Sequence, residues 1–289
     1  MSDSAPLLVV DSPSLMFRAF YALPDSITDS EGRPVNALLG TTNIVLLELE
    51  RRPARAVVFC FGAEAATYRK ELYEPYHADR VDPPEPLAHQ FAQAEMFFGA
   101  LGWQLLRDDT LEPDDLLGAL ASAETEAGGS ALILTGDRDM FQCASESVTV
   151  LYLKTGSRGA EEVGPAEVLK RYGVAPELVP DFIALRGDPS DGLPGAKGIG
   201  EKTAADLLQR HGSLEGALAN WSGETPRVRG ALREQAEELR RFKEIATLRA
   251  VAVKLPPDRP TDYAGGAEAA RWLGMNRLAE RLDNLTPKT

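Results

Sequence analysis

Apolar positions in the first 173 residues form short runs that alternate with longer periodic stretches. Short runs of the length of buried strands lie at residues 7–10, 56–61, 103–106, 131–135 and 148–153. Helical patterns occupy the intervals at residues 12–22, 36–50, 87–101 and 113–124. This alternation predicts an α/β fold with a mostly parallel central sheet flanked by helices.

The pattern changes near residue 173, after which only helical patterns follow. We therefore expect a boundary near residues 173–176, with an α/β core at 1–174 and a helical part at 175–289. The sequence shows no internal repeat and no low-complexity tract.

Composition is that of a soluble globular protein, with 44% hydrophobic and 26% charged residues among 289. The two cysteines, Cys60 and Cys143, form no CxxC motif, which argues against a disulfide framework or a zinc site and fits a reducing cytosol. The N-terminus lacks a basic region before its four-residue apolar run, so we expect neither a signal peptide nor a membrane span. A cytoplasmic protein without a membrane partner is expected.

The chain is acidic, with a net charge of −13. Asp11, Asp137 and Asp139 follow predicted strands, and five further acids join them if the 112–115 turn and the 188–191 loop reach the same edge of the sheet. Ligands of an open parallel sheet bind beyond the carboxyl ends of its strands, so acids there should converge. The candidates are Asp11, Glu112, Asp114, Asp115, Asp137, Asp139, Asp188 and Asp191. Clustered carboxylates raise one another's pKa and require protons or cations.

An all-oxygen donor set without histidine or cysteine favours Mg²⁺ or Mn²⁺, and two ions roughly 4 Å apart can promote phosphodiester cleavage. Any single Asp after a strand is more often a turn or helix cap than a ligand. Asp114 and Asp115 in a first helical turn are also favoured by the helix dipole, whatever the function. The joint pattern carries the hypothesis.

A glycine-rich stretch at residues 192–203 precedes a helical pattern and offers a second chemistry. Exposed backbone N–H groups and a helix N-terminus bind phosphate, and two lysines add positive charge. The expected DNA-contacting residues are Gly195, Lys197, Gly198, Gly200, Lys202 and Thr203. A plain turn between helices is the alternative. No strand precedes the stretch and GK[ST] is absent, so a helix-hairpin-helix grip on a DNA backbone fits better than a Walker loop.

Five motifs together resemble the 5′-nuclease (flap endonuclease) superfamily, in particular stand-alone bacterial flap endonucleases and the 5′→3′ exonuclease domain of bacterial DNA polymerase I. They are VVDSPSLMFRAFYAL (9–23), TYRKELYEPYHADR (67–80), EPDDLLGALA (112–121), LTGDRDMFQ (134–142) and LRGDPSDGLPGAKGIGEKTAADLL (185–208). The resemblance implies a PIN-like nuclease core with a helical arch. It also implies that the eight acids bind metal and that the hairpin grips duplex DNA and holds K⁺ through backbone carbonyls.

The resemblance further implies an arch at about residues 64–100 that admits a 5′ single strand. Arg69 and Arg80 match basic arch positions, and His77 stands where the family commonly has lysine. Tyr21, Tyr68 and Tyr76 are candidates for base stacking, although each is more often a packing residue. Arg69, His77 and Arg80 are the expected catalytic side chains.

The sequence departs from the family pattern at two places on the catalytic side. The family commonly has an Asp after the second strand, where this chain has Cys60, Phe61 or Gly62, with Glu64 the nearest acid. His77 carries positive charge only near or below neutral pH unless a phosphate stabilises it. Both changes put the rate in doubt more than DNA binding.

The sequence therefore predicts a monomeric, metal-dependent structure-specific 5′ nuclease that acts on DNA with 5′ flaps or 5′ ends in primer processing and repair. One alternative is a DNA-junction binding protein with weakened catalysis. The other is a metal-dependent ribonuclease with a similar acidic domain, which the hairpin and the long helical C-terminal part argue against.

Overall fold

The central sheet of this computed structural model has six strands, and the structure describes residues 5–154, 156 and 159–286. The strand order is β3-β2-β1-β4-β5-β6. Their bounds are β1 Leu7–Asp11, β2 Ala56–Gly62, β3 Gln104–Asp108, β4 Ala131–Thr135, β5 Val148–Tyr152 and β6 Glu161–Val163. All neighbouring pairs are parallel except β5 and β6. The predicted α/β class with a mostly parallel sheet is confirmed.

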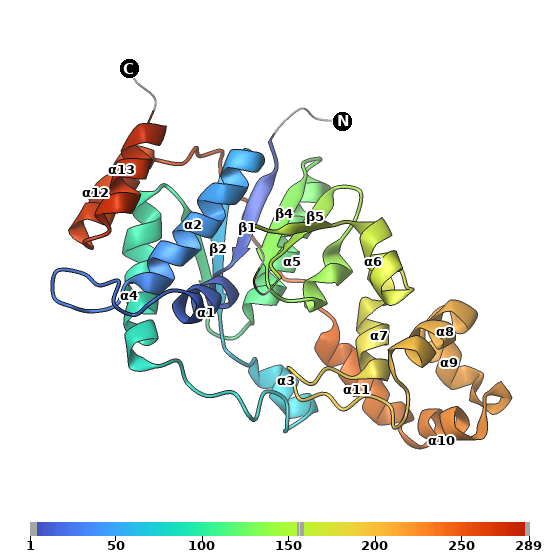
Figure 1. Cartoon of the computed structure of the whole chain (residues 1–289). Helices are drawn as coiled ribbons and strands as arrows, with labels where there is room; N and C mark the ends of the chain where they lie inside the picture. The colour runs from blue at the N-terminus through green and yellow to red at the C-terminus, as the bar shows by residue number, and fades with distance from the viewer. Residues whose placement is uncertain (1–4, 155, 157–158, 287–289) are drawn as a thin grey trace.

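Side chains along the strands alternate between two hydrophobic layers, as the two-residue period of a strand requires. Leu7 and Val9 of β1 face one layer and Leu8 and Val10 face the other. The first layer is covered by α5 (Pro113–Glu126). The second is covered by α1 (Ser12–Ala22), α2 (Asn36–Arg51) and α4 (Glu85–Ala100) (Figure 1). Between β2 and α4 lies the short helix α3 (Thr67–Leu72), away from the sheet.

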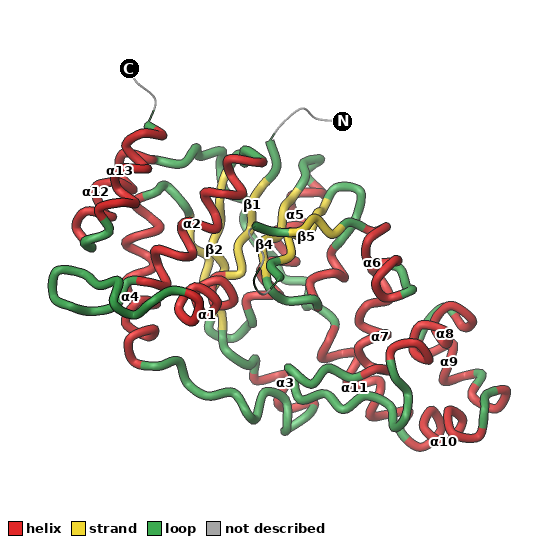
Figure 2. Tube along the Cα trace, in the orientation of Figure 1, coloured by secondary structure: helices red, strands yellow, loops and turns green. Residues whose placement is uncertain are grey.

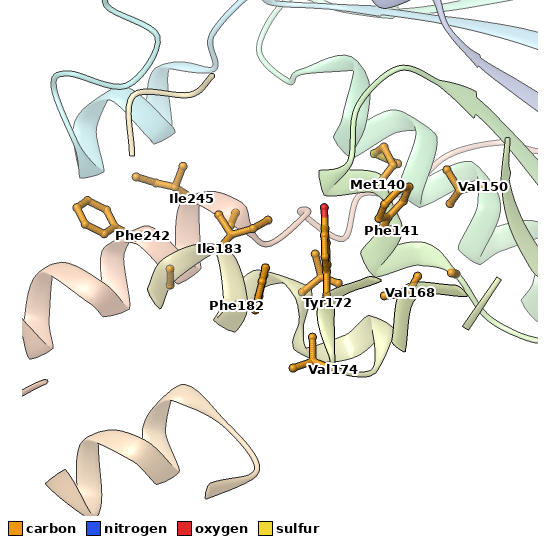
Figure 3. Close-up of a cluster of buried hydrophobic side chains, with 14 of the residues drawn as sticks. Met140, Phe141, Val150, Val168, Tyr172, Val174, Phe182, Ile183, Phe242 and Ile245 are labelled. Atoms are coloured by element: carbon orange, nitrogen blue, oxygen red, sulfur yellow. The ribbon is translucent and has the colours of Figure 1, made fainter. Parts of the chain in front are cut away.

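The helical part continues the first layer. The last helix before it is α6 (Pro165–Tyr172), and it contains α7 (Val179–Arg186), α8 (Glu201–His211), α9 (Leu214–Ala219), α10 (Pro226–Glu234) and α11 (Ala236–Ala246). Phe141, from the short 3-10 helix η1 (Asp139–Cys143), lies against Tyr172, which stacks on Phe182 with 4.8 Å between ring centroids. Figure 3 shows this cluster, in which Ile183 of α7 and Ile245 of α11 also take part. The helical part is therefore joined to the core by a continuous apolar interior.

The last two helices lie on the opposite face from the rest of the helical part. After an irregular segment at 247–262, α12 (Tyr263–Trp272) and α13 (Asn276–Leu285) pack into the layer of α4 (Figures 1 and 2). A side chain at Gly266 would lie 2.3 Å from Leu101, so the helix approaches very closely there. The predicted helical part at 175–289 therefore packs in two places, and its final segment covers the α/β core on the face of α4.

The strands at residues 7–10, 56–61, 103–106, 131–135 and 148–153 are found within a residue or two, as are the predicted helices. Strand β6 was not predicted because three residues, two of them glutamate, give no periodicity. No helix in the described ranges is both long and apolar enough to cross a membrane.

Candidate metal centre

A cavity of about 640 Å³ opens at the carboxyl ends of β1, β2 and β4. Asp11, Asp114, Asp137 and Asp191 all line it, which brings together acids from four separate segments of the chain. Glu112 lines it too, whereas Asp115, Asp139 and Asp188 do not. The opposite wall consists of side chains from residues 76–83, within the predicted arch.

Asp11 is the last residue of β1 and also caps α1. Its Oδ1 accepts a hydrogen bond from the Ser14 N–H at 3.1 Å, and its Oδ2 accepts one from the Thr135 hydroxyl at 2.6 Å. Burial raises the pKa of this carboxyl against the effect of these donors. Asp11 is therefore held rigidly with its charge only partly compensated.

Asp137 and Asp139 lie on the turn between β4 and η1. The Asp137 N–H donates to Thr135 Oγ1 at 2.9 Å, and the Asp139 N–H donates to Asp137 Oδ1 at 2.9 Å. Burial, opposed by that backbone hydrogen bond and supported by Asp191 and Asp11, raises the pKa of Asp137 to about 6. Burial and Asp137 raise the pKa of Asp139 well above its ordinary value.

Helix α5 begins with the remaining acids, and its first turn orients them differently. Burial, then Asp137 and Asp11, raise the pKa of Asp114 well above its ordinary value, as expected for like charges in one cavity. Asp115 faces away from the cavity, and Glu112 lies at its edge, held by the residue before α3. Glu112 Oε1 accepts from the Ala66 N–H at 2.7 Å, and Asp115 Oδ1 accepts from the Arg249 N–H at 2.9 Å.

Arg69 is the cation that neutralises those two acids. Its Nη1 lies 2.8 Å from Glu112 Oε2, its Nη2 donates to Asp115 Oδ1 at 2.9 Å, and its Nε donates to the Ile245 carbonyl at 3.0 Å. The residue is 3% exposed. Arg69 was expected to be a basic arch residue and a catalytic side chain. The structure instead makes it a buried link between α3, α5 and α11.

Two of the three tyrosine candidates belong to the same network. The Tyr76 hydroxyl donates to Glu112 Oε2 at 2.9 Å, and its buried ring stacks on His77 with 3.9 Å between centroids. The Tyr68 hydroxyl donates to Asp115 Oδ2 at 3.2 Å, and Arg249 lies 3.2 Å over its ring. In contrast to the expected base stacking, the Tyr76 ring is occupied by packing. Tyr21, on α1, is 71% exposed.

His77 occupies the cavity wall beside Asp191, with its backbone in the left-handed region at φ +54°. Its Nε2 lies 2.8 Å from Asp191 Oδ1, and its Nδ1 lies 3.0 Å from the Glu64 carbonyl. The ring is therefore held between the loop that carries Asp191 and the segment at Glu64. Arg80 is more open, with 42% of its side chain exposed and Nη2 3.6 Å from Asp191.

Asp188 and Asp191 share a loop closed by an antiparallel bridge between Asp188 and Leu193. Asp188 Oδ1 accepts from the Ser190 N–H at 2.9 Å, and its Oδ2 accepts from Arg186 Nη2 at 3.2 Å. Gly187 directs the chain into the loop with φ +86°, where a Cβ would lie 2.7 Å from the Leu193 carbonyl. The loop places Asp191 at the cavity wall and turns Asp188 away from that cavity.

The donor set fits a hard divalent cation, because carboxylates are the ligands that such ions prefer and these carboxylates raise one another's pKa. Asp11, Asp114, Asp137 and Asp191 line the cavity and are best placed to share ions, and Asp139 lies beside them with its N–H donating to Asp137 Oδ1. Across the described ranges, no three acidic, histidine or cysteine side chains are already arranged so that they could hold an ion. Binding would therefore require the carboxylates to turn toward one another.

Strand β2 itself ends without an acid, and the first acid after it, Glu64, lines the cavity. Cys60, paired in register with Asp11, is fully buried, and burial raises the pKa of its thiol well above the ordinary value. At Gly62 an added Cβ would lie 2.4 Å from the Leu111 carbonyl, which itself accepts from the Ala63 N–H at 2.7 Å. The backbone before α5 thus takes the space that a side chain at Gly62 would need.

The glycine hairpin exposes its backbone beside this loop. Gly195 has φ +66°, and its Cα approaches the backbone at Gly187 too closely for any side chain. The Lys197 N–H donates to Gln235 Oε1 at 2.7 Å, and Gly200 precedes the first turn of α8. Exposed members of the hairpin are Lys197, Gly198, Gly200 and Lys202, and Thr203 is half-buried.

Several residues that organise the site were not predicted. The Ser14 hydroxyl accepts from the Gly136 N–H at 3.1 Å, and Arg18 Nη2 donates to the Leu153 carbonyl at 2.6 Å. A side chain at Gly136 would lie 2.9 Å from both Arg18 and Ser14, so α1 braces the turn that carries Asp137. Their positions in the motif at 9–23 were the only available signal.

Comparisons with known proteins agree with this geometry. The family model described as the N-terminal resolvase-like domain of 5′-3′ exonucleases matches residues 6–173, and the model of their C-terminal SAM fold matches residues 174–261. A 5′-3′ exonuclease of Mycobacterium tuberculosis is 35% identical over 97% of this chain and 99% of its own length. DNA polymerase I of Thermus thermophilus is 38% identical over 96% of this chain. The chain spans less than a third of the length of the DNA polymerase I relatives.

Solved structures share the fold at low sequence identity. T5 D15 flap endonuclease, in a pseudo-enzyme-product complex with DNA and metal ions, matches with a TM-score of 0.69 and 15% identity over 97% of this chain and 98% of its own. The catalytic core of Rad2 with a DNA substrate matches with a TM-score of 0.62 and 14% identity over 98% and 91%. With both family models matched in order over most of its length, the chain belongs to the 5′-3′ exonuclease family.

Proposed function

We propose that this protein is a divalent-metal-dependent nuclease that cleaves phosphodiesters at 5′ flaps and 5′ ends of DNA, in primer processing and repair. The observation that carries the proposal is the cavity lined by Asp11, Asp114, Asp137 and Asp191. These carboxyls have raised pKa values or border on groups that do, and so favour a cation. A monomer in the cytoplasm is part of the proposal.

Different residues of the chain would bind the 5′ strand and the duplex. Arg80, half-exposed at the cavity wall, would contact a phosphate of the 5′ strand, and His77 would keep Asp191 in place through its 2.8 Å contact. Lys197 and Lys202 of the hairpin would contact the duplex backbone without reading bases. The hairpin carbonyls would hold K⁺.

Mg²⁺ or Mn²⁺ fits the carboxylate set, and two or more such ions would supply Lewis-acid chemistry at the scissile phosphate. Asp11 is held by Thr135 and Ser14, and Asp137 by the adjoining turn, so each would present an oxygen from a fixed position. A structural neighbour, T5 5′-exonuclease, binds divalent ions, zinc in one structure, which is consistent with a divalent-metal site.

The test is single-turnover cleavage of a labelled 5′-flap DNA with Mg²⁺ and with Mn²⁺. We expect cleavage by the wild type and a loss of at least about a hundredfold in Asp137→Ala, while thermal unfolding stays cooperative. Glu280→Ala, which removes an exposed acid on α13, is the matched control and should cleave normally. An Asp137→Ala protein that cleaves at the wild-type rate would refute the metal-centre assignment.

A second candidate function is a flap- or junction-binding protein with weakened catalysis. The observation that favours it is the end of β2, where the strand itself carries no acid, the backbone at Leu111 fills the space beside Gly62, and Glu64 is the first acid that lines the cavity. Tight, structure-dependent binding without cleavage of flaps, nicks or blunt ends in either metal would establish this alternative.

A further inference from the structure

A second cavity, also of about 640 Å³, lies on the other side of the turn that carries Asp137. Asp137 lines both cavities, and Asp188, which does not face the first, lines the second. The remaining walls are Gly136, Arg138, Tyr152, Arg186, Gly187, Pro189 and Ser190. Arg138 and Arg186 therefore line the same cavity as Asp137 and Asp188.

Arg138 makes its hydrogen bond within the described part of the chain through Nε. Its Nε donates to the Tyr152 hydroxyl at 3.1 Å, and its Cζ lies 5.7 Å from the centre of that ring. Its two terminal nitrogens have no hydrogen-bond partner among the residues that the structure describes, and the side chain is exposed. The guanidinium is therefore fixed in position with its donor edge unused.

Arg186 is placed in a similar way at the end of α7. Its Nε donates to the Gly187 carbonyl at 2.9 Å, its Nη2 lies 3.2 Å from Asp188 Oδ2, and its Cζ lies 5.3 Å from the Phe182 ring centre. Its Nη1 has no partner within the described part of the chain. The side chain is 20% exposed, so one donor faces the cavity at modest cost in desolvation.

We propose that the Arg138–Arg186 cavity binds a phosphate group of the DNA strand next to the scissile phosphate, on the side away from the arch. This rests on the proposed nuclease function. Two fixed guanidinium groups with free N–H donors suit a phosphate, which accepts charge-assisted hydrogen bonds through several oxygens. A metal ion would not bind the free N–H donors of either arginine, because both are cations.

The direction of the strand follows from the order of the segments. The arch wall at residues 76–83 borders only the first cavity, and residues 187–190 border only the second. Residues 187–190 run on through the loop into the glycine hairpin. A strand that passes from the arch over Asp137 toward the hairpin therefore crosses the second cavity after the scissile bond.

The experiment is a double-mutant cycle on DNA binding, in which substitution of the arginines is combined with replacement of one DNA phosphate by a neutral group. All proteins carry Asp139→Ala to block cleavage, and flap DNA is made with one methylphosphonate at each position around the cleavage site in turn. The protein pair is Arg138→Ala/Arg186→Ala against the background, and Arg277→Ala on α13 is the control for loss of an exposed arginine. Dissociation constants are measured by fluorescence anisotropy.

We expect the double substitution to weaken binding of normal DNA by about tenfold and to make the slope of log K against log salt shallower by about one unit. At one methylphosphonate position, on the duplex side of the cleavage site, the double substitution should have no further effect. Arg277→Ala should change neither quantity. Additive effects at every position would overturn the proposal.

A second arm separates an internal phosphate from a terminal one. Flapless duplexes with a 5′-phosphate or a 5′-hydroxyl are compared in the same proteins. Coupling of the arginines to the 5′-phosphate assigns the cavity to the terminal group, coupling to a methylphosphonate assigns it to an internal group, and coupling to neither overturns the proposal. If the background protein fails to bind any of these DNAs, the nuclease proposal itself fails instead.

Discussion

Replacement of Arg69 by alanine tests whether the arginine of α3 holds the site together or contacts DNA. The substitution removes the ion pair with Glu112, the hydrogen bond to Asp115 and the hydrogen bond to the Ile245 carbonyl. Two buried carboxylates are then left without their shared cation. Loss of one partner of a buried ion pair costs about 3–5 kcal/mol.

The lower part of that range applies here, because both carboxylates keep other donors. Glu112 retains the Ala66 N–H and the Tyr76 hydroxyl, and Asp115 retains the Arg249 N–H. We expect the free energy of unfolding to fall by about 3 kcal/mol, which a domain stable by about 5–15 kcal/mol survives. Cleavage should fall as well, because Glu112 loses the group that orients it.

Urea unfolding followed by circular dichroism measures the change, with the slope of the transition checked for two-state behaviour. Arg80→Ala is the control, since Arg80 is 42% exposed and 3.6 Å from Asp191, and its loss should cost less than about 1 kcal/mol. A stable Arg69→Ala protein that loses affinity for DNA would refute the network and restore the arch contact.

Three further predictions concern the hairpin and the metal. Gly195→Ala should lower the free energy of unfolding in urea by about 2 kcal/mol or more, because φ is +66° and the new Cβ would lie 2.3 Å from the Gly187 N. Gly200→Ala is the control and should be nearly neutral, because a Cβ there meets nothing within 4 Å, so equal effects would contradict this account. Lys202→Ala should make the salt dependence of DNA binding shallower by about one unit for every sequence tested, so an unchanged slope would exclude a phosphate contact. Because burial raises the pKa of Asp137 to about 6, above its ordinary 3.8, the folded protein without metal binds more protons than the unfolded chain, so its stability should fall as pH rises between those values. Mg²⁺ should therefore raise the melting temperature more near pH 8 than near pH 5, and an equal shift at both would count against an ion at these carboxylates.

The sequence predicted well where the strands and helices lie and which edge of the sheet carries the acids, because both depend on the local pattern of apolar residues. Apolar runs place Asp11 and Asp137 after parallel strands, and the topology then brings them to one cavity. The direction in which each acid faces depends on tertiary partners. Asp115 follows Asp114 in one helical turn, yet only Asp114 lines the cavity, since Arg69 lies on the other side.

Long-range partners account for most of what could not be predicted. Arg69 lies in a motif that matches basic arch positions, and nothing local indicates that the Ile245 carbonyl, 176 residues away, accepts its hydrogen bond. Likewise, the pattern of α12 is that of an ordinary amphipathic helix. Its return to the face of α4 depends on contacts such as Trp103 Nε1 to Thr261 Oγ1 at 3.0 Å.

The return of α12 and α13 makes the unit of folding longer than the stretch that the two family models match. The family models end at residue 261, but Leu278 and Leu282 of α13 complete the same apolar layer as Phe97 and Phe98 of α4. A fragment designed to stop at residue 261, where the family models end, would keep every candidate site residue and uncover that layer. Such a fragment is expected to aggregate, and its loss of activity would then carry no information about catalysis.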